Sequence, residues 1–324
     1  MNCLENKTIL LTGGTGSFGK KFVEIVLKEY RPKALRVFSR DELKQFEMAQ
    51  WFNDKRLRFL VGNVKDKDRL LRAMRGVDIV VHAAALKQVP SCEYNPFEAI
   101  KTNILGGQNV IDAAIDNKVK KVMSLSTDKA VNPVSLYGAT KLCAEKLFVQ
   151  GNAYTDNRET KISVVRYGNV VASRGSVIPL FREQKKQGVI TLTDERMSRF
   201  WITQEGAVRF IIDCLEKMQG GEVFVPKIPS MKIIDLAKVI APEAKIEIIG
   251  IRPGEKLREV LLMSEEAMHS KEFDHYFVVE PEFPFWRDNN NGGDGQSLPD
   301  GFEYRSDNNS WWLNQEDLKK ILKD

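Results

Sequence analysis

The chain has 324 residues, of which 43% are hydrophobic and 29% charged, and its formal net charge is +5. This composition is typical of a soluble globular protein, and the length allows one large α/β domain with a smaller lobe. We find no apolar run of about 18 residues and no signal-peptide pattern, which excludes a transmembrane span, and we expect no membrane partner. The positive charge fits either a solvated basic surface or attraction of an anionic substrate, and we expect no nucleic-acid partner.

The cysteines and histidines are widely spread and form no pair at metal-ligand spacing. The cysteines are Cys3, Cys92, Cys143 and Cys214. We therefore expect no metal site and a reduced, cytoplasmic protein. Cys143 lies about one helical turn beyond Tyr137, and we interpret it as a small buried thiol, not as a nucleophile.

Six short apolar runs alternate with helix-length stretches in the first half of the chain. They cover residues 8–12, 35–39, 58–61, 78–83, 121–126 and 162–167. This alternation is typical of an α/β protein with a Rossmann-type doubly wound parallel sheet. We predict a cofactor-binding Rossmann domain over residues 1–170, to which later strands also contribute.

Beyond residue 170 the alternation becomes irregular. We predict helices over residues 203–218 and 233–240 and a strand over 245–250, too few elements for a second independent core. Residues 171–285 are interpreted mainly as a smaller C-terminal substrate-binding lobe. Residues 286–324 form a predicted tail, with a polar loop at 289–295, the apolar run 311–313 and a helix over 315–322. We expect its apolar part to be buried against a lobe or a neighbouring subunit.

A glycine-rich segment directly follows the first predicted strand. Gly13, Gly16 and Gly19 stand at three-residue spacing after Thr12, where the strand passes into a helix. The first glycine permits a tight turn, the second lets the backbone approach a pyrophosphate, and the third packs the helix on the strand. In this position the motif predicts a dinucleotide site.

The second predicted strand ends in Ser39, Arg40 and Asp41, and Lys44 follows one helical turn later. A protein that binds NAD usually has a carboxylate at this strand end, whereas arginine can bind a 2′-phosphate and stack on adenine. We therefore favour NADP over NAD. The alternative is that Asp41 turns inward and Arg40 lies on the surface.

Two groups of polar residues follow the fifth predicted strand. Tyr137 and Lys141 are four residues apart in a helix-compatible run, so both face the same way. We expect the Lys141 ammonium to lower the pKa of Tyr137, so that a phenolate takes a proton from a sugar hydroxyl while a nicotinamide takes a hydride. Asp128 and Lys129, next to Thr127, add an acid and a base that alcohol oxidation does not need. The alternative for this pair is a surface ion pair at the strand end.

The glycine motif together with Tyr-x-x-x-Lys resembles the extended short-chain dehydrogenase/reductase family. Residues 38–45, 83–90, 126–130 and 252–256 further resemble the short, soluble, inverting UDP-N-acetylglucosamine 4,6-dehydratases. The resemblance implies NADP as cofactor, a UDP-sugar as substrate, a role in nucleotide-sugar biosynthesis for surface glycans, and a homo-oligomer, with a hexamer favoured over a dimer.

Two related branches differ at informative positions. The dTDP-glucose dehydratases carry Asp-Glu where this chain has Asp128 and Lys129, and the membrane-bound retaining dehydratases commonly carry Met in place of Tyr137. One departure from the family pattern is Asn63, where the family usually has Asp. The Asn63 amide can still meet adenine, but it is not an acceptor-only group.

The resemblance also implies catalytic roles. Thr127 would bind the 4-hydroxyl and Tyr137 would take its proton, while Lys141 would keep Tyr137 ionised and bind the nicotinamide ribose. NADP would accept the hydride from carbon 4, which acidifies the proton on carbon 5. Lys129, if neutral, would remove that proton, and Asp128, if protonated, would donate to the leaving 6-hydroxyl. Hydride return to carbon 6 would complete a redox-neutral dehydration with inversion at carbon 5.

Further residues are expected to contact the two ligands. For the cofactor they are Thr12, Ser17, Phe18, Asn63, Val64, Ala83, Ala84, Ala85, Lys87 and Asn103, beside the glycines, the strand-end residues, Tyr137 and Lys141. For the nucleotide-sugar they are Lys87, Asn169, Val177, Pro179, Leu180, Thr193, Arg199, Arg252 and Glu255. Two other functions stay open: a UDP-hexose 4-epimerase, which does not need the acid and base at 128 and 129, and a non-catalytic NADP-sensing protein, which has no reason to keep Thr127, Tyr137 and Lys141 together.

Overall fold

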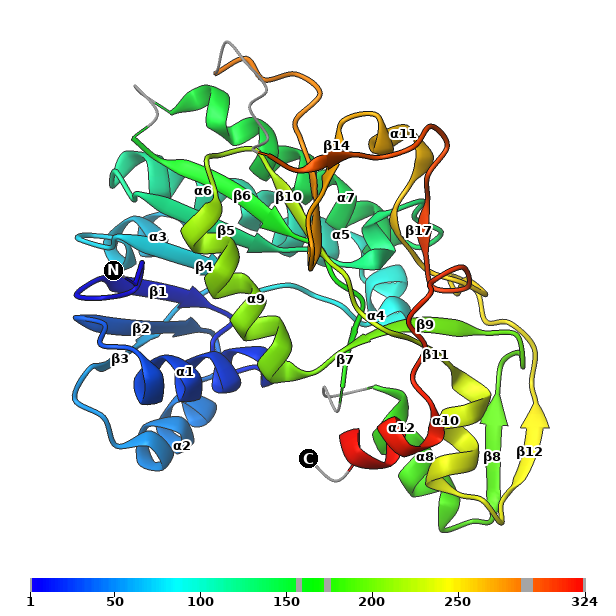
Figure 1. The fold of residues 1–324 in the computed structure, drawn as a ribbon. Coiled ribbons are helices and arrows are strands. Elements are labelled where there is room, and N and C mark those ends of the chain that lie inside the picture. Colours follow the sequence, from blue (N-terminus) through cyan, green and yellow to red (C-terminus); the bar gives the residue numbers. More distant parts are fainter. Residues whose placement is uncertain (1, 156–158, 172–175, 287–293, 323–324) are drawn as a thin grey trace.

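A ten-stranded sheet forms the centre of the computed structural model, which describes residues 2–155, 159–171, 176–286 and 294–322 (Figure 1). Its strand order is β16-β14-β15-β10-β6-β5-β4-β1-β2-β3. The strands are β1 (Thr8–Thr12), β2 (Ala34–Ser39), β3 (Leu57–Val61), β4 (Ile79–His82), β5 (Lys121–Leu125), β6 (Lys161–Val165), β10 (Val223–Pro226), β14 (Ser270–Glu272), β15 (Tyr276–Val279) and β16 (Gln296–Ser297). The strands from β10 to β3 are parallel, and β15, β14 and β16 extend the sheet with antiparallel pairs. The predicted α/β class with a doubly wound parallel sheet is confirmed.

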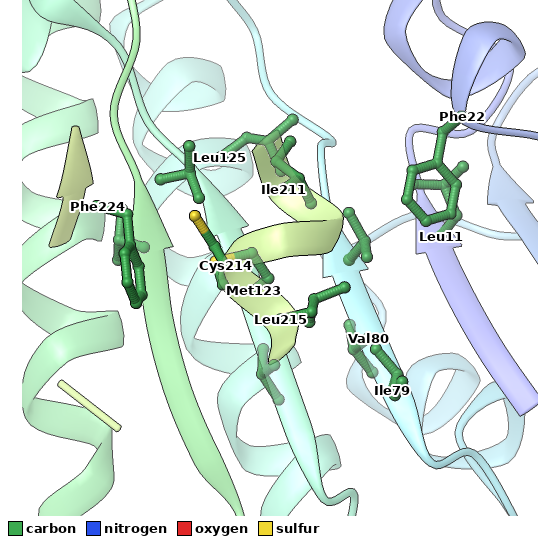
Figure 2. Packing of buried hydrophobic residues seen from close by; sticks show 14 of the residues in the cluster. Leu11, Phe22, Ile79, Val80, Met123, Leu125, Ile211, Cys214, Leu215 and Phe224 are labelled. Atoms are coloured by element: carbon green, nitrogen blue, oxygen red, sulfur yellow. The ribbon is translucent and has the colours of Figure 1, made fainter. Parts of the chain in front are cut away.

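Helices cover both faces of this sheet. α1 (Ser17–Glu29) and α9 (Gln204–Lys217) pack side by side on one face, and α3 (Lys67–Ala73), α6 (Gly106–Asp116) and α7 (Leu136–Gln150) lie on the other (Figure 1). Figure 2 shows Ile211, Cys214 and Leu215 of α9 among the apolar side chains of β4 and β5. The other helices of this part are α2 (Glu42–Phe52), α4 (Val89–Tyr94), α5 (Pro96–Ile100), α11 (Ser264–Ala267) and the helical turns η1 (Lys101–Leu105), η2 (Asp128–Ala130) and η3 (Gly151–Tyr154).

The smaller lobe has a hydrophobic core of its own. It contains α8 (Val177–Lys185), α10 (Ile233–Ile240), a parallel pair of β8 (Val189–Leu192) and β12 (Lys245–Ile248), and a three-stranded sheet of β7 (Asn169–Val170), β9 (Ser198–Ile202) and β11 (Ser230–Lys232). Ile178, Phe181 and Leu236 are buried in its centre. The prediction that this region lacks a separate core is wrong, because residues 176–202 form a helix and two strands that supply apolar side chains. Pro179 is tolerated there because it lies in the first turn of α8.

The C-terminal tail docks on both the main core and this lobe. β17 (Tyr304–Arg305) pairs with β13 (Val260–Leu262), and α12 (Gln315–Ile321) packs against α10 and buries Leu318. Docking of the tail was predicted, but Trp311 is 54% exposed, so only part of the apolar run is buried within this chain. The predicted loop at 289–295 lies largely outside the described residues. Among the residues that the structure describes, no helix is long and apolar enough to cross a membrane.

Candidate active site

A cavity of about 1130 Å³ lies between the carboxyl ends of the parallel strands and the smaller lobe. Most of the predicted site residues line it. They are Gly13, Gly16, Ser17, Phe18, Ser39, Arg40, Lys44, Asn63, Val64, Ala83, Ala84, Ala85, Lys87, Thr127, Lys129, Tyr137, Lys141, Asn169, Val177, Pro179, Leu180, Thr193, Arg199, Arg252 and Glu255. Ligands of this fold bind at the carboxyl edge of the sheet. Four predicted residues do not line the cavity: Thr12, Gly19, Asn103 and Asp128.

The glycine loop forms a cradle that any side chain would fill. Gly13 has a φ of +66°, and a Cβ there would lie 2.8 Å from the backbone nitrogen of Ala84. A Cβ on Gly19 would lie 2.2 Å from the carbonyl oxygen of Gly14, so Gly19 serves the packing of α1. Gly16 is the N-cap of α1 without a side-chain cap, so the backbone N–H groups of the first turn are free to bind an anion. The loop therefore fits the pyrophosphate of a dinucleotide.

Thr12 and Asn103 support the cavity wall from behind. The Thr12 hydroxyl lies 2.7 Å from His82 Nδ1, and burial together with Lys141 lowers the pKa of His82 to about 3, so this imidazole is neutral. Asn103 accepts from the Leu86 N–H at 2.8 Å and donates to its carbonyl at 2.9 Å. Both residues fix strand ends and loops whose neighbours line the cavity.

The end of β2 presents hydroxyl and cationic groups to the cavity. Gln45 Nε2 donates to Ser39 Oγ at 2.9 Å, which fixes that hydroxyl. Asp41 is the N-cap of α2, accepts from the backbone of Lys44 and is ion-paired with the Lys44 ammonium. Arg40 is exposed and lines the cavity beside them. The Asp41 carboxylate also lines the cavity, but it is already neutralised by Lys44.

Tyr137 and Lys141 both line the cavity, but they do not influence each other as predicted. Burial raises the pKa of Tyr137 to about 12, and Lys129 and the Thr127 hydroxyl oppose that rise. Burial lowers the pKa of Lys141 to about 8, and its Nζ donates to the Leu125 carbonyl at 2.6 Å. The cation that opposes the raised pKa of Tyr137 in this structure is Lys129, and the predicted effect of Lys141 on this pKa is not seen.

The acid–base pair after β5 lies inside the fold: the Asp128 side chain is fully buried, and the Lys129 side chain is 30% exposed and lines the cavity, which argues against an ion pair on the outer surface. Lys129 Nζ donates to Asp128 Oδ1 at 2.9 Å and to Asn169 Oδ1 at 3.2 Å, and Thr127 Oγ1 donates to Asp128 Oδ1 at 2.9 Å. Asp128 is fully buried, and burial raises its pKa although Lys129 opposes the rise. Burial favours neutral Lys129, but the neighbouring carboxylates of Asp128 and Glu259 outweigh it and raise its pKa. The carboxylates therefore favour the ammonium form of Lys129, whereas the predicted role as a base needs the neutral amine.

The electrostatics of the site depend on a residue that was not predicted. Glu259, just before β13, lines the cavity and lies 3.5 Å from Lys129 Nζ and 2.9 Å from Lys256 Nζ. Arg199, expected to bind pyrophosphate, is 7% exposed and lies 3.7 Å from the same carboxylate. The run 255–259 alternates charges in a way typical of a solvated segment, so no sequence signal separated Glu259 from its neighbours.

Two further predicted binding residues, Arg252 and Asn169, contact other residues of the cavity wall. The exposure of Cys143 differs from its prediction. Arg252, half-exposed, lies 3.8 Å from Glu255. Asn169, expected at the pyrophosphate, accepts from Lys129. Cys143, predicted to be buried, is exposed, because its position on α7 faces away from the sheet.

Sequence comparison places these features in a known family. The family described as polysaccharide biosynthesis protein matches residues 9–281. The chain belongs to this family, a branch of the extended short-chain dehydrogenases/reductases. It is 52% identical over 324 residues to a UDP-N-acetylglucosamine 4,6-dehydratase (inverting) of Campylobacter jejuni, covering 98% of this chain and 97% of that protein. It is also 42% identical over 328 residues to a UDP-glucose 4-epimerase of Rickettsia akari, covering 98% and 95%. The predicted family resemblance is confirmed.

Solved structures agree with this placement. The X-ray structure of Pen from Bacillus thuringiensis is similar with 41% identity and a TM-score of 0.89, and 99% of each chain is covered. A dTDP-glucose 4,6-dehydratase from Streptomyces venezuelae, solved with NAD bound, has 23% identity and a TM-score of 0.69 over 77% of this chain and 86% of that one. At this identity the second likeness shows the fold alone.

Proposed function

We propose that this protein is an inverting UDP-N-acetylglucosamine 4,6-dehydratase, a hydro-lyase of nucleotide-sugar biosynthesis for surface glycans. The observation that carries the proposal is the buried contact of 2.9 Å between Asp128 and Lys129, in the wall of a cavity that Thr127 and Tyr137 also line. An acid–base pair at this place serves elimination of water, which an epimerase does not perform. The identity of 52% to a relative with this name supports the same activity.

The first half of the reaction is oxidation at carbon 4. When bound, a nicotinamide dinucleotide supplies the hydride acceptor for this step and the hydride donor for carbon 6. The glycine loop would hold its pyrophosphate, and Lys141 would bind its ribose. Thr127 and Tyr137 orient the 4-hydroxyl, and Tyr137 takes its proton. Lys129 favours that phenolate, because it is the cation that opposes the raised pKa of Tyr137.

The second half is loss of water across carbons 5 and 6. Transfer of one proton from Lys129 to Asp128 over their hydrogen bond converts the ion pair into a neutral amine and a neutral acid. The amine then removes the proton on carbon 5, and the acid is the proton source for the leaving 6-hydroxyl. Because Asp128 does not line the cavity, its proton reaches the substrate through Thr127 or Lys129, which do. Loss of water leaves a double bond between carbons 5 and 6 beside the 4-keto group. Return of the hydride to carbon 6, which the bound dinucleotide would supply, and addition of a proton to carbon 5 from the opposite face would then give a UDP-2-acetamido-2,6-dideoxy-4-keto-hexose with inverted configuration at carbon 5.

The experiment that tests this function is turnover of UDP-N-acetylglucosamine in heavy water. Wild type should release water and place one deuterium on carbon 5 of an inverted 4-keto-6-deoxy product. Lys129→Ala should retain ligand binding and lose about a hundredfold or more in exchange at carbon 5, the usual effect of one positioned base. The matched control is Lys146→Ala, an exposed lysine of α7. A product epimerised at carbon 4 without loss of water would refute the dehydratase and support the epimerase that the Rickettsia relative suggests.

We further propose NADP as the cofactor within the nicotinamide dinucleotide class. Arg40 and Lys44 line the cavity at the end of β2, and Asp41, whose carboxylate also lines it there, is paired with Lys44. Nucleotide released on denaturation should be NADP(H), and Arg40→Ala should weaken binding of NADP more than of NAD. Recovery of NAD alone would refute this choice.

A homo-oligomer, with a hexamer favoured over a dimer, is part of the same proposal. Large apolar side chains on the surface support it, among them Tyr94 (88% exposed), Trp51 (75%) and Phe97 (74%). Light scattering that shows a monomer at working concentration would contradict it. We also propose a cytoplasmic location, supported by the buried thiols of Cys92 and Cys214. The proposed division is a Rossmann domain (1–170), to which β10, β14 and β15 contribute from beyond residue 170, a region that is mainly the substrate lobe (171–285), and a tail (286–324).

A further inference from the structure

One buried carboxylate in the cavity wall faces three cations. Glu259 is 2% exposed. Its Oε1 lies 3.5 Å from Lys129 Nζ and 3.7 Å from Arg199 Nε, and its Oε2 lies 2.9 Å from Lys256 Nζ. These cations come from η2, from β9 and from the loop before β13. Lys256 also donates to the Val131 carbonyl at 2.9 Å, which ties this loop to the turn after η2.

The two carboxylates beside Lys129 differ in their other partners. Oδ1 of Asp128 accepts from Thr127 and Lys129, and its Oδ2 has no hydrogen-bond partner among the residues that the structure describes. Protonation of Glu259 would leave Lys256 and Arg199 without their shared counter-ion in a buried place. Protonation of Asp128 leaves no cation unpaired, so this transfer costs less free energy.

We propose that Glu259 is a positioning residue for the elimination step: it holds Lys129 at the cavity wall and makes Asp128 the acceptor of the Lys129 proton. In this transfer an N–H bond of Lys129 breaks and an O–H bond forms on Asp128. The inference rests on the proposed dehydratase function and names a residue that acts through the base, not on the sugar.

The ionisation of the neighbouring groups agrees with this assignment. Burial raises the pKa of Asp128, and Glu259 adds to the rise. Burial would also raise the pKa of Glu259, but Lys129, Arg199 and Lys256 outweigh it and lower the pKa. Asp128 and Glu259 raise the pKa of Lys129, and Arg199 opposes them. Lys129 in turn lowers the pKa of Lys87 and opposes the raised pKa of Tyr137.

The backbone at Glu259 is held independently of its carboxylate. Its N–H donates to Ser306 Oγ at 2.9 Å, and the Ser306 N–H donates to the Glu259 carbonyl at 2.9 Å. Glu259→Gln, which keeps the shape and removes the charge, is therefore expected to fold. The variant therefore tests the charge of Glu259 without disturbing the backbone contacts of this residue.

The test uses the enzyme with its nicotinamide cofactor bound and two readouts. In single turnover, Glu259→Gln should still reduce the cofactor with UDP-N-acetylglucosamine. Carbon 5 exchange in heavy water should fall about tenfold or more at neutral pH, because Lys129 loses the carboxylate that holds it at the cavity wall, even though its neutral form becomes more available. The second readout is acylation of Lys129 by acetic anhydride, followed across pH by peptide mass spectrometry. In Glu259→Gln the pH at which half of Lys129 reacts should be lower than in wild type by about one pH unit or more, because one of the two carboxylates that stabilise the ammonium is lost. Glu265→Gln removes an exposed carboxylate from the same segment and should match wild type in both.

Two results would overturn the proposal. One is an unchanged rate of carbon 5 exchange with an unchanged acylation midpoint. The other is an equal loss of cofactor reduction and exchange, which would make Glu259 a structural residue only. Failure of the dehydratase function is distinguishable, because wild type would then show no exchange at carbon 5, while the acylation midpoint still reports on the contact between Glu259 and Lys129.

Discussion

Replacing Lys141 with methionine is expected to stabilise the folded protein at neutral pH while it abolishes turnover. Lys141 is 6% exposed, and burial lowers its pKa from 10.5 to about 8 although Glu145 opposes the shift. In the folded state the ammonium is therefore penalised relative to the unfolded chain. The buried ammonium therefore lowers the free energy of unfolding, which is the consequence of placing a charged group in the proposed cofactor site.

The magnitude follows from the two pKa values. The lowering of the Lys141 pKa from 10.5 to about 8 corresponds to a destabilisation of the folded state by about 3.4 kcal/mol at low pH, at about 1.36 kcal/mol per pH unit. Because the pKa in the folded state is the lower one, the destabilisation is absent above pH 10.5, where Lys141 is neutral in both states. It grows as the pH falls and is complete below pH 8. Methionine removes the penalty but leaves the Leu125 carbonyl without its donor, which costs about 1–3 kcal/mol. The variant should gain roughly 0.5–2 kcal/mol at pH 7, and about 2.5 kcal/mol of relative stability should disappear between pH 7 and pH 10.

Urea unfolding of both proteins at pH 7 and pH 10, followed by tryptophan fluorescence, measures this difference. Other titrating groups cancel, since they are common to both proteins. Lys146→Met, on the exposed face of the same helix, should change stability by less than about 0.5 kcal/mol at either pH. A Lys141→Met protein whose stability relative to wild type is the same at both pH values would refute the assignment of a buried lysine with a lowered pKa.

Two further substitutions test the frame of the site. Gly19→Ala places a Cβ 2.2 Å from the Gly14 carbonyl oxygen, so it should cost about 1–3 kcal/mol or more and weaken cofactor binding; thermal unfolding and cofactor titration equal to wild type would contradict this. Arg166→Met leaves Glu145 and Glu266 buried without their shared cation, so it should cost about 3–5 kcal/mol in urea unfolding. That loss should shrink in acid as the two carboxyls become protonated, and a loss that does not depend on pH would argue against the ion triad.

Local patterns account for the part of the fold that could be predicted. The six strands could be predicted because buried parallel strands are continuous apolar runs. The glycine loop could be predicted because each position needs a residue without a side chain, for the turn, for the approach of a phosphate or for helix packing. The core of the smaller lobe was missed because β9 carries Ser198 and Arg199 in a strand that is buried throughout. Arg199 is tolerated there through its contact with Glu259, which is distant in sequence.

The positions of the proposed catalytic side chains could be predicted, but their ionisation could not. Spacing places Tyr137 and Lys141 on one face of α7, and both line the cavity. Their pKa values depend on burial and on which charges fold against them, and these charges come from remote segments. Lys129 is the clearest case, since its charged state is set by Glu259 and not only by its sequence neighbour Asp128.

The segment that carries Glu259 also connects the two sides of the active site. At one end Glu259 holds the cations of the cavity wall, with its backbone paired to Ser306 of the tail. A few residues on, the Leu261 carbonyl and the Glu266 carboxylate accept from the buried Arg166, at 2.9 Å and 2.8 Å. Arg166 is also paired with Glu145, on the helix that bears Tyr137 and Lys141. A displacement of this segment would therefore change the surroundings of the elimination base and of the oxidation pair together, which gives the docked tail a direct physical link to both halves of the proposed reaction.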